Sequence, residues 1–258
     1  MTDLYALFGN PITQSKSPNI HRQFAEQTGQ DMHYTKQLVA LGEFEQAAQE
    51  FFDQGGKGLN ITVPFKLNAF DFAQKRTARA ERAGAVNTLA KLSDGTILGD
   101  NTDGIGMIHD MHNLGWELEG KRILILGAGG AVRGILQPLL EEKPAQVVIA
   151  NRTYSKAEEL AKNFHDMGDV QVKTFEQLPG EIFDLVINGT SASMQGELPP
   201  LPDNLLAANA SCYDMMYAAE PTIFLRWAQE RGAAQLADGL GMLIGQAAEA
   251  FYLWRQIR

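Results

Sequence analysis

The spacing of apolar residues alternates between two periods along the first part of the chain. Short apolar runs at 4–12, 32–40 and 56–66 predict three strands, because glycine, proline and polar residues bound them. Apolar positions three or four residues apart predict helices over 17–30 and 42–56, between these strands. The order strand, helix, strand, helix, strand predicts a βαβαβ unit with a mostly parallel sheet.

The segment 67–84 continues the helical spacing and predicts one further helix. In the segment 85–104, strand-like runs lie on both sides of Asp94 and Gly95, a turn signal typical of a hairpin. Within this unit, the ends of helix 17–30 are marked by particular residues. Ser17 is a candidate N-cap, Pro18 suits the first turn and Gly29 suits the end.

A second α/β unit follows. The segment 104–116 has a helical pattern, and 121–153 has the order buried strand, glycine turn, helix, strand. The later segments predict two more strands of this sheet, a proline-rich surface loop and a last helix, at 183–189, 211–217, 196–204 and 241–258. We therefore expect an α/β protein with two domains. The boundaries are 1–103, completed by a C-terminal helix at 240–258 that packs back on it, and 104–239.

Composition narrows the class of protein. The chain has 258 residues, 45% of them hydrophobic, so it can bury a core of one large or two ordinary domains. Its single cysteine, Cys212, excludes an internal disulfide and is expected to be a buried small side chain. A net charge of -9 disfavours nucleic acid and anionic membranes as partners. We expect a cytoplasmic protein that binds a small molecule and has no metal site.

The stretch ILILGAGGAVRG carries a glycine fingerprint where a strand meets a helix. Gly127 would allow the tight turn and Gly129 would let a pyrophosphate approach the backbone, while the helix offers N–H donors. The third position of the fingerprint is Val132, which requires different packing of helix against strand. A turn without a ligand is the alternative. The fingerprint predicts a dinucleotide site of the Rossmann type at Gly127, Ala128, Gly129, Gly130 and Ala131.

The next strand ends in ANRTYSK, where NAD-binding folds usually place an acidic residue on the ribose. Here the chain has Asn151, Arg152 and Thr153, with Lys156 close behind. A carboxylate would repel a 2′-phosphate, whereas the Arg152 guanidinium can bind one with two hydrogen bonds. The cofactor predicted by these residues is NADP (NADPH); a solvated Arg and Lys at a strand end is the alternative.

Lys66 and Asp103 are the candidates for proton transfer. Lys66 is predicted at the end of a strand, and Asp103 lies where the chain leaves the first domain, so both can face a cleft. A carbonyl–alcohol interconversion needs a proton donor or acceptor beside the hydride carrier. Taken singly, Lys66 is more often a surface lysine and Asp103 in TDG more often a turn former than a catalytic residue.

The ordered motifs of the chain resemble those of the shikimate dehydrogenase family. They are GNPITQSKSPNIH, GLNITVPFK, GAVNTL, GDNTDG, GAGGAVRG, NRT, YDMMY and DGLGMLIGQAAEAF. The resemblance covers nearly the whole chain and implies an NADP-dependent oxidoreductase that reduces 3-dehydroshikimate to shikimate in chorismate and aromatic amino acid biosynthesis. Family members commonly continue beyond the position of Arg258 into a short helix.

The resemblance also implies site residues. Lys66 and Asp103 would be the catalytic pair, and Met215, Gly239, Met242 and Thr190 would contact the cofactor. The implied substrate pocket draws on Ser15, Ser17, Asn60, Thr62, Asn87, Tyr217 and Gln246. Hydroxyl and amide groups of this kind can match the ring hydroxyls and carboxylate of shikimate. Simple core packing is the alternative for Met242, and an N-cap is a further role for Ser17.

Two other functions stay open from the sequence. One is a quinate/shikimate dehydrogenase that accepts quinate or NAD; the other is a catalytically silent NADP-binding protein. Arg152 and its neighbours argue against NAD, and the joint presence of Lys66, Asp103 and the polar set argues against a silent protein. We expect a monomer or a homodimer.

Overall fold

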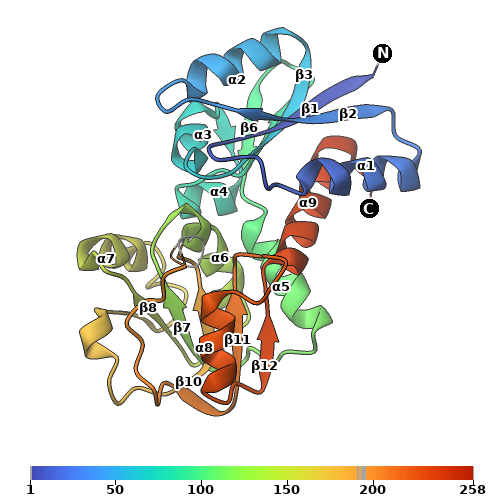
Figure 1. Cartoon of the computed structure of the whole chain (residues 1–258). Coiled ribbons are helices and arrows are strands. Elements are labelled where there is room, and N and C mark those ends of the chain that lie inside the picture. Colours follow the sequence, from blue (N-terminus) through green and yellow to red (C-terminus); the bar gives the residue numbers. More distant parts are fainter. Residues whose placement is uncertain (1, 191, 193–195, 258) are drawn as a thin grey trace. The chain divides into compact units, whose positions relative to one another are not determined.

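The structure is a computed structural model, and it describes residues 2–190, 192 and 196–257. The chain forms two compact units. Unit 1 comprises Met1–Gly106 and Leu243–Arg258, and unit 2 comprises Met107–Met242. The boundaries fall inside helices α5 (Asp103–Asn113) and α9 (Leu240–Arg255), a few residues from those expected from the sequence (Figure 1).

Unit 1 is built on a six-stranded sheet with the order β2-β1-β3-β5-β6-β4. The strands β2, β1 and β3 are parallel, and β5 runs antiparallel to both β3 and β6, as the predicted hairpin requires. The strands are β1 (Asp3–Gly9), β2 (Met32–Leu38), β3 (Gly56–Ile61), β4 (Lys75–Arg76), β5 (Thr88–Lys91) and β6 (Ile97–Asp100). The helices are α1 (Ser17–Thr28), α2 (Phe44–Asp53), α3 (Lys66–Phe72) and α4 (Ala78–Ala83), with most of α9.

Helices cover both faces of the unit 1 sheet (Figure 1). Phe8 of β1 packs on one face against Phe44 of α2. On the other face, Tyr5 of β1 contacts Trp254 of α9, with ring centroids 4.7 Å apart. A Cβ on Gly58 of β3 would collide with the Trp254 indole, so the C-terminal helix lies directly on the sheet. The predicted return of this helix to the first domain is confirmed.

Two local predictions in unit 1 were wrong. The segment predicted as one helix over 67–84 forms α3 and α4 with β4 between them. The backbone becomes extended at Ala73, and the Arg76 guanidinium donates to the carbonyls of Phe70 and Ala73 there. Ser17 does not cap α1, since it is the first helical residue and Lys16 holds the N-cap position. The predicted Pro18 start and the left-handed Gly29 end are confirmed.

Unit 2 has a second six-stranded sheet, with the order β12-β11-β10-β7-β8-β9 and every pair parallel. Its helices are α6 (Gly130–Glu141), α7 (Tyr154–Lys162) and α8 (Ile223–Glu230), with most of α5, and a short 3-10 turn η1 (Phe175–Gln177). The strands are β7 (Arg122–Leu126), β8 (Gln146–Ala150), β9 (Val170–Lys173), β10 (Phe183–Asn188), β11 (Leu206–Asp214) and β12 (Gln235–Ala237).

Alternate residues of β7 face two different cores. Ile123 and Ile125 pack with side chains of α5, α6 and α7. Leu124 and Leu126 pack with the aromatic side chains of α8 on the opposite face. This alternation follows from the period of two in a strand and makes unit 2 a doubly wound sheet. The predicted α/β class and Rossmann-type second unit are confirmed.

The strand order of unit 2 reverses between β7 and β10. From β7 the chain moves outward to β8 and β9, then returns to the other side of β7 with β10. In open α/β sheets, ligands bind beside the carboxyl ends of the strands at such a reversal. The turns after β7, β8, β10 and β11 are therefore where a nucleotide site belongs. Among the described helices, none is long and apolar enough to cross a membrane.

Candidate active site

Lys66 and Asp103 form an ion pair in unit 1. The Lys66 ammonium donates a hydrogen bond to Oδ2 of Asp103. The side chains are 14% and 7% exposed, so the pair is largely shielded from water while part of Lys66 remains accessible. The sequence predicted Lys66 at the end of a strand, and this was wrong. The strand β3 ends at Ile61, and Lys66 is the first residue of α3. Asp103 begins α5, so the pair joins the first turns of two helices.

Asn87 holds the second oxygen of this carboxylate. Its Nδ2 donates to Oδ1 of Asp103 at 2.8 Å, and its Oδ1 accepts from the backbone N–H of Thr102 at 2.9 Å. A backbone N–H can only donate, so this contact fixes which end of the amide is the oxygen. Asn87 is 2% exposed and directly precedes β5.

Gln246 reaches the same group from α9. A Cβ on Gly245 would lie 2.8 Å from the carbonyl oxygen of Gly106, so α5 and α9 approach closely at this pair of glycines. The approach places Oε1 of Gln246 within 3.4 Å of Nδ2 of Asn87. Gln246 is buried, and its Nε2 donates to the Leu243 carbonyl at 2.9 Å.

Asn60 connects Asn87 to Tyr34, a residue of strand β2. Asn60 lies on β3 and is 3% exposed. Its Oδ1 accepts from the Tyr34 hydroxyl at 2.8 Å, and its Nδ2 donates to the Thr88 hydroxyl at 3.1 Å. Thr88 in turn donates to Oδ1 of Asn87 at 2.9 Å. These side chains are hydrogen-bonded one to the next, and we call the series the polar chain: Tyr34, Asn60, Thr88, Asn87, Asp103 and Lys66.

The two predicted serines lie beside the start of α1. The Ser15 hydroxyl donates to the Ser17 hydroxyl at 3.2 Å, and Ser17 is 3% exposed. Burial raises the pKa of Tyr34 well above 10.0, and the neighbouring Ser17 hydroxyl opposes that rise. Thr62, just after β3, is half-buried. Six predicted site residues of unit 1 thus lie on or beside the polar chain or the ion pair: Ser17, Asn60, Lys66, Asn87, Asp103 and Gln246.

Sequence reasoning missed three residues of this region, Tyr34, Thr88 and Thr102. Thr88 stands next to Asn87 in the GAVNTL motif, which was its only signal. Tyr34 lies on β2 and Asn60 on β3, and these strands are separated by β1 in the sheet. Their contact depends on the strand order, which the local sequence does not encode.

His21 lies under this region in an aromatic cluster. Its ring stacks on Tyr34 with centroids 4.2 Å apart and also contacts Phe251 and Trp254 of α9. Neither ring nitrogen has a partner at normal hydrogen-bond geometry among the described residues, although the Asn60 side chain is close enough to favour a protonated ring and so to oppose the fall of the pKa. Burial lowers the pKa of His21 from 6.5 to about 3, so the imidazole is neutral at physiological pH.

The glycine turn of unit 2 has the geometry that the sequence predicted for a nucleotide site. Gly127 follows β7 with φ of 104°, a left-handed conformation that only glycine adopts readily. Gly129 is the N-cap of α6, and a Cβ built on it would meet none of the described side chains or neighbouring segments within 4 Å. The N-terminus of α6, with its free backbone N–H groups, begins at this glycine, which is the geometry expected for an anion site.

The departure at Val132 has a structural explanation. Val132 is fully buried in the first turns of α6. A Cβ added to Gly189, after β10, would collide with Cγ2 of Val132. Because Gly189 has no side chain, the larger side chain of Val132 fits between α6 and the turn after β10. Helix and strand pack closely despite the missing third glycine of the fingerprint.

The turn after β8 carries the predicted phosphate-binding residues. Arg152, Thr153 and Lys156 are all exposed, and neither Arg152 nor Lys156 has an ion-pair partner in the described part of the chain. Thr153 is the N-cap of α7 but makes no capping hydrogen bond. Asn151 supports the turn by donating to the Thr153 carbonyl at 2.8 Å. The corner therefore presents a guanidinium, an ammonium, a hydroxyl and a helix N-terminus to solvent.

Other predicted cofactor residues gather at the same edge of the unit 2 sheet. A Cβ on Gly127 would lie 3.2 Å from Cγ2 of Thr190, and one on Gly239 would collide with the Met215 carbonyl. Met242 is 7% exposed and belongs to the hydrophobic core beneath, in agreement with the packing role left open for it. Tyr217, predicted for the substrate, follows β11 in unit 2 and is half-buried.

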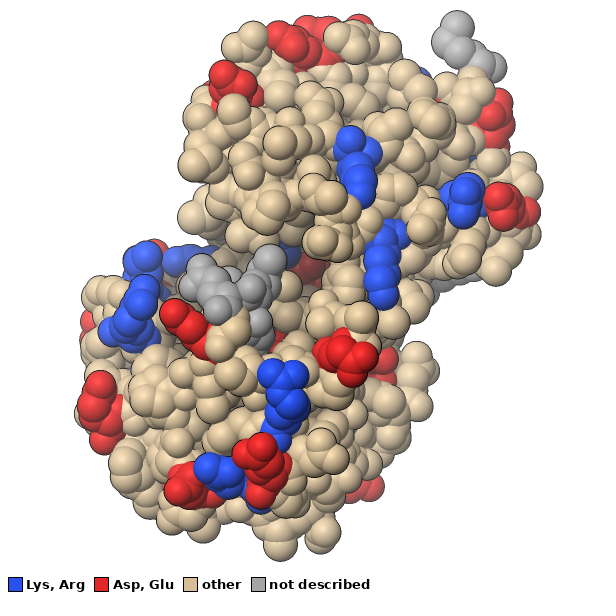
Figure 2. Space-filling model, in the orientation of Figure 1, with Lys and Arg blue, Asp and Glu red and all other residues tan. Residues whose placement is uncertain are grey.

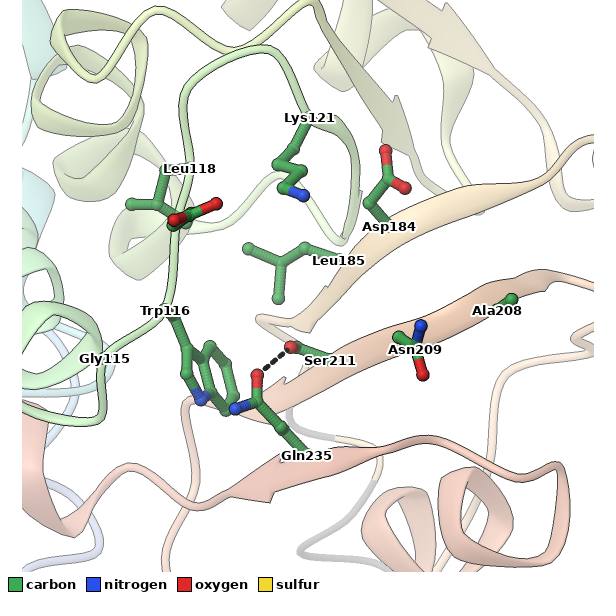
Figure 3. Close-up of a pocket in the computed structure, with 11 residues that line it drawn as sticks. Gly115, Trp116, Leu118, Lys121, Asp184, Leu185, Ala208, Asn209, Ser211 and Gln235 are labelled. Atoms are coloured by element: carbon green, nitrogen blue, oxygen red, sulfur yellow. Dashed lines mark hydrogen bonds between the residues drawn. The ribbon is translucent and has the colours of Figure 1, made fainter.

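A separate pocket of about 290 Å³ lies at the opposite edge of this sheet (Figure 3). Asp184 and Gln235 stand near the amino ends of β10 and β12, and Lys121 directly precedes β7. At one side of the pocket, Ser211 of β11 donates to Gln235 of the neighbouring strand β12 at 2.8 Å. No predicted site residue lines it. The nucleotide argument therefore depends on the carboxyl-end turns and not on this pocket.

The remaining side chains show no other reactive site in the described part of the chain. Cys212 is fully buried, as expected, and burial raises the pKa of its thiol to about 12. Among the described residues, no group of three His, Cys, Asp or Glu could hold a metal ion. On the face drawn in Figure 2, basic side chains are interspersed with acidic ones.

The fold and the two groups of side chains define an NADP-dependent oxidoreductase of the α/β class. The doubly wound unit has a glycine turn and an exposed group of cations, and the other unit has a shielded lysine–carboxylate pair among amides and hydroxyls. Three family models match the chain. They are described as the shikimate dehydrogenase substrate binding domain (residues 7–89), shikimate / quinate 5-dehydrogenase (110–195) and the shikimate 5'-dehydrogenase C-terminal domain (239–258). The chain belongs to the shikimate dehydrogenase family.

Individual relatives agree with this assignment. A protein of Cellvibrio japonicus (strain Ueda107), named shikimate dehydrogenase (NADP(+)), is 75% identical over 258 residues, which cover 100% of this chain and 94% of that protein. A crystal structure of an Ael1 enzyme from Pseudomonas putida has a TM-score of 0.91 and 46% identity, covering 100% and 94% of the two chains. A shikimate 5-dehydrogenase from Thermus thermophilus, in complex with NADP(H) and shikimate, has a TM-score of 0.88 and 30% identity, covering 99% and 94%.

Proposed function

We propose that this chain is an NADP-dependent shikimate dehydrogenase that interconverts 3-dehydroshikimate and shikimate. The observation that carries the proposal is the Lys66–Asp103 ion pair, shielded from water and tied to the amide of Asn87. A solvated surface lysine would not be 14% exposed with its carboxylate partner held from two sides. The Cellvibrio japonicus relative and the Thermus thermophilus complex support the same substrate and cofactor.

The residues of unit 2 fit NADP. Arg152 and Lys156 are exposed cations without ion-pair partners in the described chain, which suits a 2′-phosphate. The open space at Gly129 suits a pyrophosphate on the N-terminus of α6. When bound, NADPH supplies the hydride for reduction of the C3 carbonyl.

The residues of unit 1 supply binding and the proton. Lys66 donates the proton to the oxygen of the carbonyl as it becomes an alcohol, and Asp103 orients the ammonium. Ser15 and Ser17, whose hydroxyls are in contact at the start of α1, are assigned to the carboxylate of the substrate. The first turn of a helix favours an anion, which supports this assignment. The amides of Asn60, Asn87 and Gln246, with Thr62 and Tyr217, are assigned to the ring hydroxyls.

The test is an absorbance assay at 340 nm, the wavelength of reduced nicotinamide, with the purified chain. Shikimate or quinate is combined with NADP or NAD in all four combinations. Turnover mainly with shikimate and NADP supports the proposal and the role of Arg152. Comparable turnover with quinate or NAD would replace it with the broader quinate/shikimate dehydrogenase function.

Absence of turnover in all four combinations would contradict any catalytic function. Binding of NADP to such a folded, inactive protein, measured by calorimetry, would then favour the silent NADP-binding protein. We further propose a cytoplasmic location, and a monomer or homodimer. Sedimentation velocity at assay concentration distinguishes these two states.

A further inference from the structure

Two residues that carry no predicted role, Tyr34 and Thr88, occupy the junctions of the polar chain. Thr88 is fully buried and lies between the amides of Asn60 and Asn87. Tyr34 lies at the far end, beyond Asn60. An amide side chain has a donor end and an acceptor end of nearly the same shape, so its two orientations must be distinguished by its neighbours. These two hydroxyl groups are in position to do so.

The orientation begins at a backbone group. The N–H of Thr102 donates to Oδ1 of Asn87 at 2.9 Å, and a flipped amide would bring two donors together. Nδ2 of Asn87 therefore faces Oδ1 of Asp103 at 2.8 Å. The carboxylate of the ion pair is held by a donor whose direction the backbone sets.

Thr88 transmits this orientation to Asn60. Oδ1 of Asn87 can only accept, so the Thr88 hydroxyl must donate its single proton to it, at 2.9 Å. The Thr88 oxygen is then left as an acceptor, and it receives Nδ2 of Asn60 at 3.1 Å. A hydroxyl with one proton thereby links the directions of two amides.

Tyr34 completes the arrangement. With Nδ2 of Asn60 directed to Thr88, Oδ1 of Asn60 faces the Tyr34 hydroxyl, which donates to it at 2.8 Å. Burial raises the pKa of Tyr34, so the phenol keeps the proton that this contact needs. Stacking on His21, with ring centroids 4.2 Å apart, holds the phenol ring in place.

We propose that Thr88 and Tyr34 are positioning residues of the reaction. They pass the direction of the Asn87 amide, which the Thr102 N–H sets, on to Asn60 and so fix which end of the Asn60 amide faces the substrate. The inference depends on the proposed function, because it assigns these amides to the site of the Lys66–Asp103 pair. Oδ1 of Asn60 has a second lone pair, so a substrate hydroxyl placed there would donate to it.

The test compares Thr88→Val, which keeps the shape and removes the hydroxyl, with Thr88→Ser, which keeps the hydroxyl. A buried hydrogen bond to a polar partner is worth enough to lower kcat/KM for shikimate by about 10- to 100-fold in Thr88→Val. We expect KM for NADP to change by about twofold or less, and Thr88→Ser to retain kcat/KM within about threefold of the wild type. Thr28→Val, which removes a partly buried hydrogen bond to the Phe24 carbonyl elsewhere in unit 1, is the matched control.

The outcomes separate the two proposals. If the wild type turns over none of the four substrate and cofactor pairs, the proposed function fails. If the wild type is active and Thr88→Val matches it, or if Thr88→Ser loses as much kcat/KM as Thr88→Val, the positioning role is overturned. Should Thr88→Val not fold, Tyr34→Phe tests the same inference, since it keeps the ring stacked on His21. We expect KM for shikimate to rise about 3- to 10-fold there, and an unchanged KM would overturn the role of Tyr34.

Discussion

The polar chain of unit 1 and the turn after β8 in unit 2, which we call the cationic corner (Arg152, Thr153 and Lys156), differ in how their polar groups are satisfied. In the polar chain, buried amides, hydroxyls and charges have hydrogen-bond partners within the protein itself. At the corner, Arg152, Thr153 and Lys156 are exposed and their side chains have no ion pair or capping bond in the described chain. One region is organised in advance, and the other keeps its donors for a ligand.

The difference follows from where each group can be solvated. A buried polar group without a partner costs about 1–3 kcal/mol, so the interior of unit 1 must satisfy its own groups. An exposed guanidinium is solvated by water and can exchange it for a phosphate at little cost. A directional reaction suits the first arrangement, and recognition of an anion suits the second.

The largest effect is expected at the ion pair. Lys66→Ala removes the proposed proton donor, and kcat should fall by about 10²- to 10⁴-fold, the usual contribution of general acid–base catalysis. NADP affinity, measured by fluorescence or calorimetry, should stay near that of the wild type, because Lys66 belongs to unit 1. Lys57→Ala, which removes an exposed lysine on β3, is the control. If Lys66→Ala kept the full kcat of the wild type, the polar chain would not contain the proton donor of the reaction.

Removing the guanidinium tests the open corner. Arg152→Ala should raise KM for NADP by about 10- to 100-fold, since a charged hydrogen bond contributes about 1.5–3 kcal/mol. KM for NAD should rise far less, so the preference for NADP over NAD narrows. Lys162→Ala removes a cation from the other end of α7 and serves as the control. If the ratio of the KM values for NADP and NAD did not change, Arg152 would not bind the 2′-phosphate of NADP.

The packing beneath the glycine turn gives a prediction about stability. Gly189→Ala places a Cβ against Cγ2 of Val132 and should destabilise the protein by about 1–3 kcal/mol, measured by urea unfolding. Val132→Ala alone should also destabilise it, by opening a cavity. In the double variant the two changes should compensate in part. Strictly additive losses would contradict the pairing of Val132 with Gly189.

The smallest effect concerns the acid stability of unit 1. Burial holds the pKa of His21 at about 3, whereas in the unfolded chain the imidazole takes up a proton below about pH 6.5. Between these values the unfolded state binds more protons, so the free energy of unfolding falls as the pH falls. The slope from this group is about 1.4 kcal/mol per pH unit.

His21→Phe should remove that slope while keeping the stack on Tyr34. Denaturant unfolding of both proteins between pH 6.5 and 4.5 measures it. The stability of the variant relative to the wild type should rise as the solution is acidified. Parallel curves would show that His21 gains a proton or a partner inside the fold.

Much of the architecture was predictable because its signals are local. Period-two apolar runs and the Asp94-Gly95 turn predicted the strands and the hairpin of unit 1, and Gly127 with the following helix predicted the nucleotide turn. The N-cap role of Ser17 and the single helix over 67–84 were predicted wrongly. The chain enters α1 one residue earlier than the cap pattern suggests, and the helix over 67–84 is interrupted after Phe72, where Arg76 binds two carbonyls.

The sequence by itself determined the α/β class, the two units, the glycine turn, the cations after β8 and the candidate pair Lys66 and Asp103. Only the tertiary structure decided that Tyr34 meets Asn60 across an intervening strand, that Thr88 links the amides of Asn87 and Asn60, and that Val132 is matched by Gly189. Helix periods, turns and charge depend on neighbouring residues in the chain, so a sequence carries them. Hydrogen-bond direction and close packing depend on which distant segments meet, and that is fixed only when the sheet has assembled.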